Sequence, residues 1–246
     1  MRTYPLKEAD LIVSFFARDQ GKLRGVAKRA RRPKNTFGSG LERLSHVRLA
    51  YFQRENRELV NLDSCDLIHS QFNVLSDYGA CVALDYFAEV SEQLLPAGEV
   101  NERFFRLLLA VLEQMRSDEA GKVWRAASYF SLWAVRLSGF LPDLDVCLGC
   151  GNWLDEPGRP ERAFFHYSRD GLLCESCRRS LVAGRSEELS AESRRIAAEM
   201  LRTPVGQLTK TEWVQGTAAD LRRFLVQHIE RHIERRLITV PVLETV

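Results

Sequence analysis

Apolar and polar residues alternate in short runs through the first 66 positions, which is typical of β-strands rather than helices. Strands are predicted at residues 11–18, 23–28, 47–52 and 59–63. Antiparallel strands this short can bury enough apolar surface within about 65 residues only when the sheet curls on itself. The pattern therefore predicts a small β-barrel at this end of the chain.

Two turns are predicted between these strands. The first is Asp19, Gln20 and Gly21, in which glycine can adopt a positive φ without steric cost. The second is at Glu55 and Asn56. Each turn marks the end of one apolar run and the start of the next.

The period changes to that of helices between residues 69 and 140. A first helix is expected to end at Pro96 and Gly98, with Val90 and Leu94 near its end. Its inward face is expected to carry Leu75, Tyr78, Val82 and Phe87. Such a stripe is the ordinary signal of core packing.

Two more helices follow in this region. Asn101 is a suitable N-cap for the second, and the third is predicted at residues 122–137, ending at Gly139. The apolar face of the second helix is Phe104, Leu108, Val111, Leu112 and Met115. After an irregular segment at 141–185, further helices are predicted at about 190–202 and 217–236. The apolar side of the last helix is Leu221, Phe224, Leu225, Ile229 and Ile233.

Positive charge is concentrated near one end of the chain. The formal net charge is only +2, but residues 17–54 hold eleven Lys or Arg and two acids, a local excess of +9. Seven of these cations fall between positions 22 and 34 with no acid among them: Lys22, Arg24, Lys28, Arg29, Arg31, Arg32 and Lys34. Phosphate backbones are the commonest partner of such a segment, and the alternative is a solvated basic loop.

Several function classes are disfavoured by the same sequence. No apolar run reaches the roughly 18 to 20 residues of a membrane span, and acids interrupt the apolar stretch near the N-terminus, so a soluble intracellular protein is expected. The chain lacks the glycine-rich phosphate loop, the Gly-x-Ser-x-Gly nucleophile turn and the dinucleotide fingerprint. We therefore expect a protein that is not an enzyme and has no contact with a membrane.

Four of the six cysteines form two Cys-x-x-Cys pairs separated by 23 residues: Cys147, Cys150, Cys174 and Cys177. Two such turns can direct four thiolates at one ion, which predicts a structural Zn²⁺ site with no open position. A thioredoxin-like pair and an iron–sulfur cluster are the weaker alternatives. Cys65 and Cys81 are expected to be small apolar fillers.

A second pattern that could bind a metal ion is a pair of histidines. His228 and His232 lie four residues apart in the last predicted helix, a spacing that can place two imidazoles on one face. Charged residues surround both of them in the sequence, so we expect solvated surface rather than a metal site.

The order of several segments resembles the RecO family of bacterial DNA repair proteins. The segments are residues 4–13, running into 16–23, then 25–34, then 141–145 leading into 147–151. The resemblance covers nearly the whole chain. It implies an α+β protein with an oligonucleotide-binding (OB-fold) barrel at 1–66 and a helical domain at 69–246. A four-cysteine zinc knuckle at 141–185 is inserted in the C-terminal part.

The resemblance also implies a function. Members act as recombination mediators that bind single- and double-stranded DNA, anneal complementary strands, work with RecR, and help RecA load onto DNA coated by single-strand binding protein. The acidic tail of the latter would bind the helical part, and the protein would be cytoplasmic and nucleoid-associated. DNA contact is carried over onto Lys22, Arg24, Lys28, Arg29, Arg31, Arg32 and Lys34. One of the neighbours Tyr51 and Phe52 must face the core, so only the other can stack on a base.

One departure from the family concerns the start of the barrel. Members usually have a further strand ahead of the position of Tyr4, so a first barrel strand is expected to be clipped here, leaving an unpaired edge.

Two other classes of function compete with DNA binding. The runner-up is a zinc-ribbon module that recognises an acidic protein partner through the basic segment. A thiol oxidoreductase is third, and it would require the four cysteines to cycle without binding metal.

Overall fold

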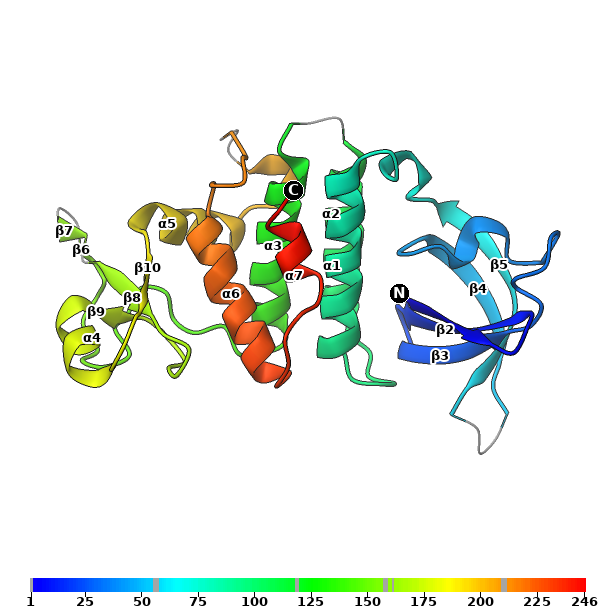
Figure 1. The fold of residues 1–246 in the computed structure, drawn as a ribbon, viewed down its shortest axis with the longest axis horizontal. Coiled ribbons are helices and arrows are strands. Elements are labelled where there is room, and N and C mark those ends of the chain that lie inside the picture. Colours follow the sequence, from blue (N-terminus) through cyan, green and yellow to red (C-terminus); the bar gives the residue numbers. More distant parts are fainter. Residues whose placement is uncertain (1, 55–57, 118–119, 157–158, 161, 209–211) are drawn as a thin grey trace. The chain divides into compact units, whose positions relative to one another are not determined.

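A computed structural model describes residues 2–54, 58–117, 120–156, 159–160, 162–208 and 212–246 (Figure 1). The turn predicted at Glu55 and Asn56 lies outside these residues. The chain divides into two compact units. The first is Met1–Arg116 together with Leu237–Val246, and the second is Ser117–Arg236.

Five strands in the first unit form one sheet: β1 (Arg2–Leu6), β2 (Asp10–Ala17), β3 (Gly21–Ala27), β4 (His46–Phe52) and β5 (Val60–His69). Their spatial order is β1-β2-β3-β5-β4, in which only the β3–β5 pair is parallel. This five-stranded, mostly antiparallel sheet has the strand order of an OB-fold. The predicted α+β class and N-terminal strand region are confirmed.

Strand β1 was not anticipated. It pairs with β2 in antiparallel register, from Arg2 opposite Ser14 to Leu6 opposite Asp10. Pro5 lacks an N–H donor, but β1 lies at an edge of the sheet, where proline is tolerated. The segment around Tyr4 is thus itself a strand, and the sheet has five strands.

The barrel core consists of apolar side chains that face inward from these strands and from the following loop. The fully enclosed members are Val13, Ala27, Phe37, Val60 and Leu62. Tyr51 packs against this core with its ring centroid 5.8 Å from that of Phe15, whereas the neighbouring Phe52 is 61% exposed. The period-2 pattern of β4 is therefore confirmed, and Tyr51 is the inward member of the pair.

The turn predicted at Asp19–Gly21 is confirmed, and Gly21 has a φ of 71°. A Cβ at Gly21 would overlap the backbone of Glu99, because the turn packs directly against the segment that follows the first helix. Lys22 joins the same contact, since its carbonyl oxygen accepts a hydrogen bond from the N–H of Gly98 at 2.9 Å.

Replacing Gly21 by alanine is therefore expected to lower the free energy of unfolding by about 2–4 kcal/mol, combining left-handed strain with overpacking. Gly98 is a matched control, since its φ is 73° but nothing lies within 4 Å of a Cβ there. Gly98→Ala should lower the free energy of unfolding by only about 1 kcal/mol, because left-handed backbone strain is the only penalty there. Urea unfolding of both full-length variants measures this, and equal losses would contradict the close approach at Gly21.

Two helices complete most of the first unit: α1 (Tyr78–Leu94) and α2 (Glu102–Arg116). Asn101 caps α2 as predicted, because its Oδ1 accepts the N–H of Phe104 at 3.0 Å. The expected inward face of α1 is partly wrong. Leu75 precedes the helix, after the short turn η2 (Phe72–Val74), and is 48% exposed, while Tyr78 at the first position is 67% exposed. The helix begins only after Asp77, whose carboxylate accepts the N–H of Ala80.

A buried carboxylate on α1 holds the C-terminal segment. Glu89 is 1% exposed and accepts hydrogen bonds from the backbone N–H groups of Ile238 and Thr239 and from the Thr239 hydroxyl, at 2.7–3.0 Å. Burial opposes ionisation, but these hydrogen bonds outweigh it and the pKa of Glu89 lies below its usual value. The short helix α7 (Val240–Leu243) is thereby fixed against α1.

The second unit contains α3 (Lys122–Leu137), α5 (Ala191–Met200) and α6 (Ala219–His232), all near their predicted positions. The cysteine region adds α4 (Glu175–Leu181), and its short strands are β6 (Asp155–Glu156), β7 (Arg159–Pro160), β8 (Ala163–Phe165), β9 (Leu173–Cys174) and β10 (Glu187–Leu189). Two further short 3₁₀ helices in the described residues are η1 (Gly38–Leu41), in the first unit, and η3 (Val205–Gln207), in the second. Gly139 follows α3 with a φ of 84°, as a C-terminal glycine should.

The expectation of solvated histidines on α6 is wrong for one of the two. His228 is only 5% exposed, and its Nδ1 lies 2.9 Å from the carbonyl oxygen of Phe224. His232 is exposed and stacks on Phe140 with ring centroids 4.1 Å apart. The two imidazoles therefore have separate environments.

Arg222 on the same helix is also buried. It lies over the ring of Trp124, with the guanidinium carbon 4.5 Å from the ring centroid, and donates to the carbonyl oxygens of Thr217 and Gln215. Among the described residues, no helix has the length and apolar character needed to cross a membrane.

Candidate nucleic-acid interface and metal centre

The connection from β3 to η1 carries most of the predicted DNA contacts. We call residues 28–34 the basic loop. Two hydrogen bonds fix its start, from the N–H of Arg29 to Asp10 Oδ1 at 2.8 Å and from the N–H of Arg31 to the carbonyl oxygen of Ala9 at 3.0 Å. The loop is thus held against the β1–β2 turn.

The far end of the loop is also anchored. Asn35 Oδ1 accepts the N–H groups of Phe37 and Gly38, and Thr36 Oγ1 donates to the carbonyl oxygen of Asp63 on β5 at 3.1 Å. The side chain of Phe37 is buried in the barrel core. A cationic segment that cannot itself be buried is therefore tied to the barrel at both ends.

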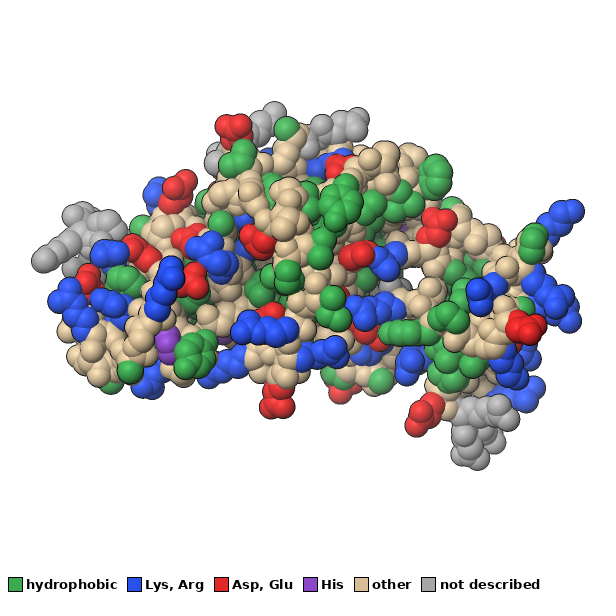
Figure 2. Space-filling model, viewed as in Figure 1, with side chains coloured by type: hydrophobic (Ala, Val, Ile, Leu, Met, Phe, Trp, Pro, Cys, Tyr) green, Lys and Arg blue, Asp and Glu red, His purple; other side chains and the backbone are tan. Residues whose placement is uncertain are grey.

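Five cations of the basic loop are exposed: Lys28, Arg29, Arg31, Arg32 and Lys34. Within the described part of the chain, no acidic side chain forms an ion pair with any of them. Figure 2 shows Lys and Arg side chains gathered over the strand region of the first unit. This arrangement leaves the positive charge available to an external polyanion.

Two predicted contacts lie apart from the loop. Arg24 is exposed on β3, with its guanidinium carbon 5.6 Å from the centroid of the Tyr4 ring. Lys22 is half-buried, and its ammonium group donates to the carbonyl oxygen of Glu92 on α1 at 2.6 Å. Lys22 therefore fastens the barrel to α1, whereas the loop cations have no such role.

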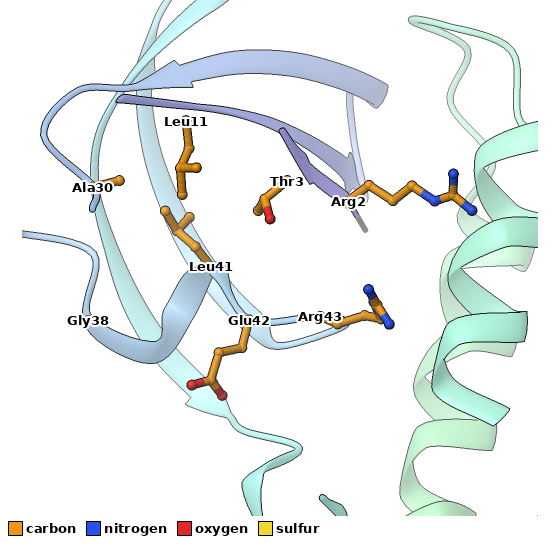
Figure 3. A pocket seen from close by; sticks show the side chains of 8 residues that line it. All are labelled: Arg2, Thr3, Leu11, Ala30, Gly38, Leu41, Glu42 and Arg43. Carbon is orange, nitrogen blue, oxygen red and sulfur yellow. The ribbon is translucent and has the colours of Figure 1, made fainter. Parts of the chain in front are cut away.

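A cavity of about 570 Å³ lies beside the basic loop, lined in part by Ala30 and Leu41 (Figure 3). Arg2 and Arg43 both extend along one side of it. Each has an acidic partner on α1, because Arg2 lies 3.8 Å from Glu89 and Arg43 contacts Asp85. These cations are already neutralised, so we assign no anion site to this cavity.

The four predicted ligand cysteines come together in the second unit. Their sulfur atoms all lie within 4.8 Å of one another, and Cys150 Sγ is 3.9 Å from Cys174 Sγ. Four thiolates around one Zn²⁺ would have sulfurs about 3.8 Å apart, given Zn–S bonds of about 2.3 Å. The predicted clustering is confirmed, and the quartet is a candidate metal site.

A tight turn positions the first cysteine pair, Cys147 and Cys150. The N–H of Cys147 donates to the carbonyl oxygen of Asn152 at 2.8 Å, closing a tight turn in which Gly151 has a φ of 74°. A Cβ at Gly149 would lie 2.9 Å from both Cβ and Sγ of Cys177. Glycine at 149 therefore allows the first turn to approach the second pair.

The second pair uses the start of a helix. Cys174 ends β9 and is the N-cap of α4, so that its sulfur accepts the N–H of Cys177 at 3.5 Å. Cys147 and Cys174 are buried, while Cys150 is exposed. The quartet is thus enclosed on one side by protein and open on the other.

The thiols perturb one another strongly. Burial opposes ionisation of Cys147, but the N–H groups of Cys174, Cys150 and Gly149 lower its pKa to about 7. Hydrogen bonding to the Cys174 side chain, together with burial, raises the pKa of Cys177 to about 12. Four thiols so close cannot all ionise without a cation between them, which is the condition that a bound metal ion relieves.

Sequence reasoning overlooked two cations, one on β4 and one just after its end. Arg48 and Arg54 are exposed, and in the described residues neither has an ion pair. The sequence pattern could have identified Arg48, because it occupies an outward position between the inward residues Val47 and Leu49 of the strand.

Comparison with known proteins covers the whole chain. Residues 1–71 match the family model described as Recombination protein O N terminal, and residues 75–239 match Recombination protein O C terminal. The chain is 48% identical to a protein named DNA repair protein RecO from Koribacter versatilis, over 99% of this chain and 95% of that one. It is 30% identical to a protein of the same name from Cutibacterium acnes, over 99% and 96% of the two chains. A third relative so named, from Anaeromyxobacter sp. strain Fw109-5, is 26% identical over 100% and 93%.

Proposed function

Because the chain belongs to the RecO family of DNA repair and recombination proteins, we propose that it is a non-enzymatic recombination mediator. It would bind single- and double-stranded DNA, anneal complementary strands and help RecA load onto DNA coated by single-strand binding protein. RecR and the tail of single-strand binding protein would be its protein partners, as the family resemblance implies. The observation that supports DNA binding is the basic loop, with five exposed cations and no acidic partner among the described residues.

The mechanism of annealing would be electrostatic. Two complementary strands repel each other through their phosphates, and cations held on a rigid surface neutralise that repulsion. The basic loop is suited to this task because hydrogen bonds to Asp10 and Ala9 fix its backbone, and Thr36 next to its end is bonded to Asp63, while its side chains remain free to follow a phosphate chain. Phosphate contacts carry no sequence information, so binding should show little sequence preference.

We further propose that the cysteine quartet holds a structural zinc ion. Cys147, Cys150, Cys174 and Cys177 supply four soft thiolate ligands, which fits Zn²⁺ and leaves no position for water or substrate. When bound, the ion would cross-link the turn at 147–150 to the start of α4 and take no part in chemistry.

Annealing across a salt series tests the proposed function. Mixing two complementary labelled oligonucleotides with the protein should accelerate duplex formation at low salt, and the acceleration should fade as salt rises. The logarithm of the binding constant should fall against log salt with a slope of about −0.7 to −0.9 per phosphate contacted. Absence of both binding and acceleration at low salt would instead support the zinc-stabilised interaction module with an acidic partner.

A further inference from the structure

A second cavity, of about 660 Å³, lies within the first unit between the barrel and α2. Five aromatic side chains line it: Phe15, Phe16, His46, Tyr51 and Phe105. They form two groups, measured between ring centroids: Phe16 and His46 lie 5.9 Å and 6.0 Å from Phe105, and Phe15 lies 5.8 Å from Tyr51. We call this space the aromatic cavity.

The rings are not closed off from solvent. All five are half-buried, and the apolar floor is completed by side chains of α2 that include Leu109, which is also half-buried. Aromatic surface that stays partly exposed inside a concavity of this size is suited to a planar ligand.

The rim of the aromatic cavity carries charged side chains of both signs. Arg18 and Arg48 line it, and Asp19 is the only acid among the described lining residues. Glu102 neutralises Arg18 through a hydrogen bond of 2.7 Å, but Arg48 is exposed and has no acidic partner in the described part of the chain. Arg48 is therefore placed to bind an anionic group next to the rings.

The cavity also offers polar recognition groups from the backbone. Strand β4, which supplies residues 46–49 and Tyr51 to the lining, is an edge strand of the sheet. One row of its backbone N–H and C=O groups is consequently not used for pairing with β5. Such groups can hydrogen-bond to the edge of a nucleobase.

We propose that the aromatic cavity is a binding site for one unpaired nucleotide of single-stranded DNA. The base would lie among the rings of Phe16, His46 and Phe105, and a flanking phosphate would bind Arg48. This inference rests on the proposed DNA-binding function and adds to it a site specific for single strands. A base in a duplex is stacked and paired, so it cannot enter the cavity unless it is extruded.

The chemistry favours a nucleotide over a purely apolar occupant. A planar aromatic group gains stacking energy from the rings, and its phosphate complements Arg48, whereas an apolar side chain would leave the cation and the β4 edge unused. The size agrees as well, because a volume of about 660 Å³ is within the range of small-ligand sites.

The test compares three probes with the full-length protein: a 15-residue oligothymidine, an abasic strand of the same length, and a 15-base-pair duplex. Phe105→Leu removes one ring while keeping apolar volume, and Leu109→Trp fills the cavity without removing a ring. Phe72→Leu is the matched control, since Phe72 is 67% exposed and does not line the cavity. Arg48→Ala changes only an exposed side chain and serves if a cavity variant fails to fold.

We expect Phe105→Leu and Leu109→Trp each to weaken oligothymidine binding about tenfold, the loss of one stacked base, as measured by fluorescence anisotropy. Duplex and abasic-strand affinities should stay within twofold, and Phe72→Leu should behave as the unaltered protein. Arg48→Ala should weaken oligothymidine binding severalfold more than duplex binding.

Unchanged oligothymidine affinity in the cavity variants would overturn the inference, as would an equal loss for duplex. Binding of a short apolar peptide to the unaltered protein would be a second possible result. If Leu109→Trp abolished that binding but left oligothymidine binding unchanged, the cavity would be assigned to a peptide and the inference would also be overturned. The proposed function fails separately, if variants of the basic loop bind both single strands and duplex as tightly as the unaltered protein.

Discussion

Replacing Lys28, Arg29, Arg31 and Arg32 together by alanine is expected to weaken DNA binding by about a hundredfold to a thousandfold at 0.1 M salt. Each phosphate contact raises the binding constant at 0.1 M salt by roughly 0.8 log units relative to 1 M salt, through counterion release. The loss should be similar for single strands, duplex and all sequences, and the salt slope should become shallower by about 3. Because these side chains are exposed and make no ion pair with described residues, the melting temperature should be unchanged.

A control of equal charge is available in the second unit. Arg179, Arg223, Arg231 and Arg236 each already pair with an acid, respectively Glu175, Glu187, Asp170 and Glu230. Replacing these four by alanine removes the same formal charge but should change DNA affinity by less than about threefold, since exposed and paired charges contribute little. Titrations of both quadruple variants with DNA across a salt series measure this difference in affinity. Equal affinity of the basic-loop variant and the unaltered protein would refute the assignment of the loop.

Removal of zinc is expected to unfold the region around 141–185. The free energy of binding structural zinc in zinc-finger peptides is about 10–16 kcal/mol near pH 7 and is coupled to folding, so this segment should not stay ordered without the ion. The small core that the ion would hold together includes Leu154, Leu172 and Leu173, all essentially unexposed. We expect one zinc per chain by elemental analysis, loss of amide-exchange protection in 141–185 on chelation, and recovery when zinc is restored.

Cysteine variants distinguish a role in binding the metal from other roles of the thiols. Cys174→Ser should lose the zinc, because Cys174 is buried within the quartet and caps α4. Cys81→Ser should keep it, since Cys81 lies on α1 outside the quartet. A melting temperature that chelation leaves unchanged would show that the ion is not structural. Metal-free protein whose cysteines cycle with a dithiol reductant would favour the oxidoreductase.

Local sequence predicted many elements of this protein correctly. Asn101 before an apolar period of 3.6 predicted the start of α2, and Gly21 after Asp19 and Gln20 predicted the turn between β2 and β3. These predictions succeeded because capping and positive φ depend on residues within a turn of each other. The cysteine spacing succeeded for a related reason, since two residues between thiols suffice to aim both at one ion.

Other features depended on distant residues and were not predicted. Strand β1 exists because β2 offers it a partner, although Pro5 weakens its local signal. His228 and Arg222 look like solvated charges in the sequence, yet both are buried on α6. Arg222 is stabilised by carbonyl oxygens of Thr217 and Gln215 and by the ring of Trp124, about a hundred residues away.

By itself, the sequence determined that the chain has a strand-rich, basic N-terminal region, a helical remainder and two pairs of metal-type cysteines. Composition, period and short-range spacing carry that information. Only the tertiary structure decided which cations are available to a partner. Lys22 and Lys28 are six positions apart and chemically identical, but the carbonyl oxygen of Glu92 occupies the first and no described acid pairs with the second. The difference arises because a hydrogen bond to a residue 70 positions away depends on how the barrel packs against α1, and no local pattern reports that packing.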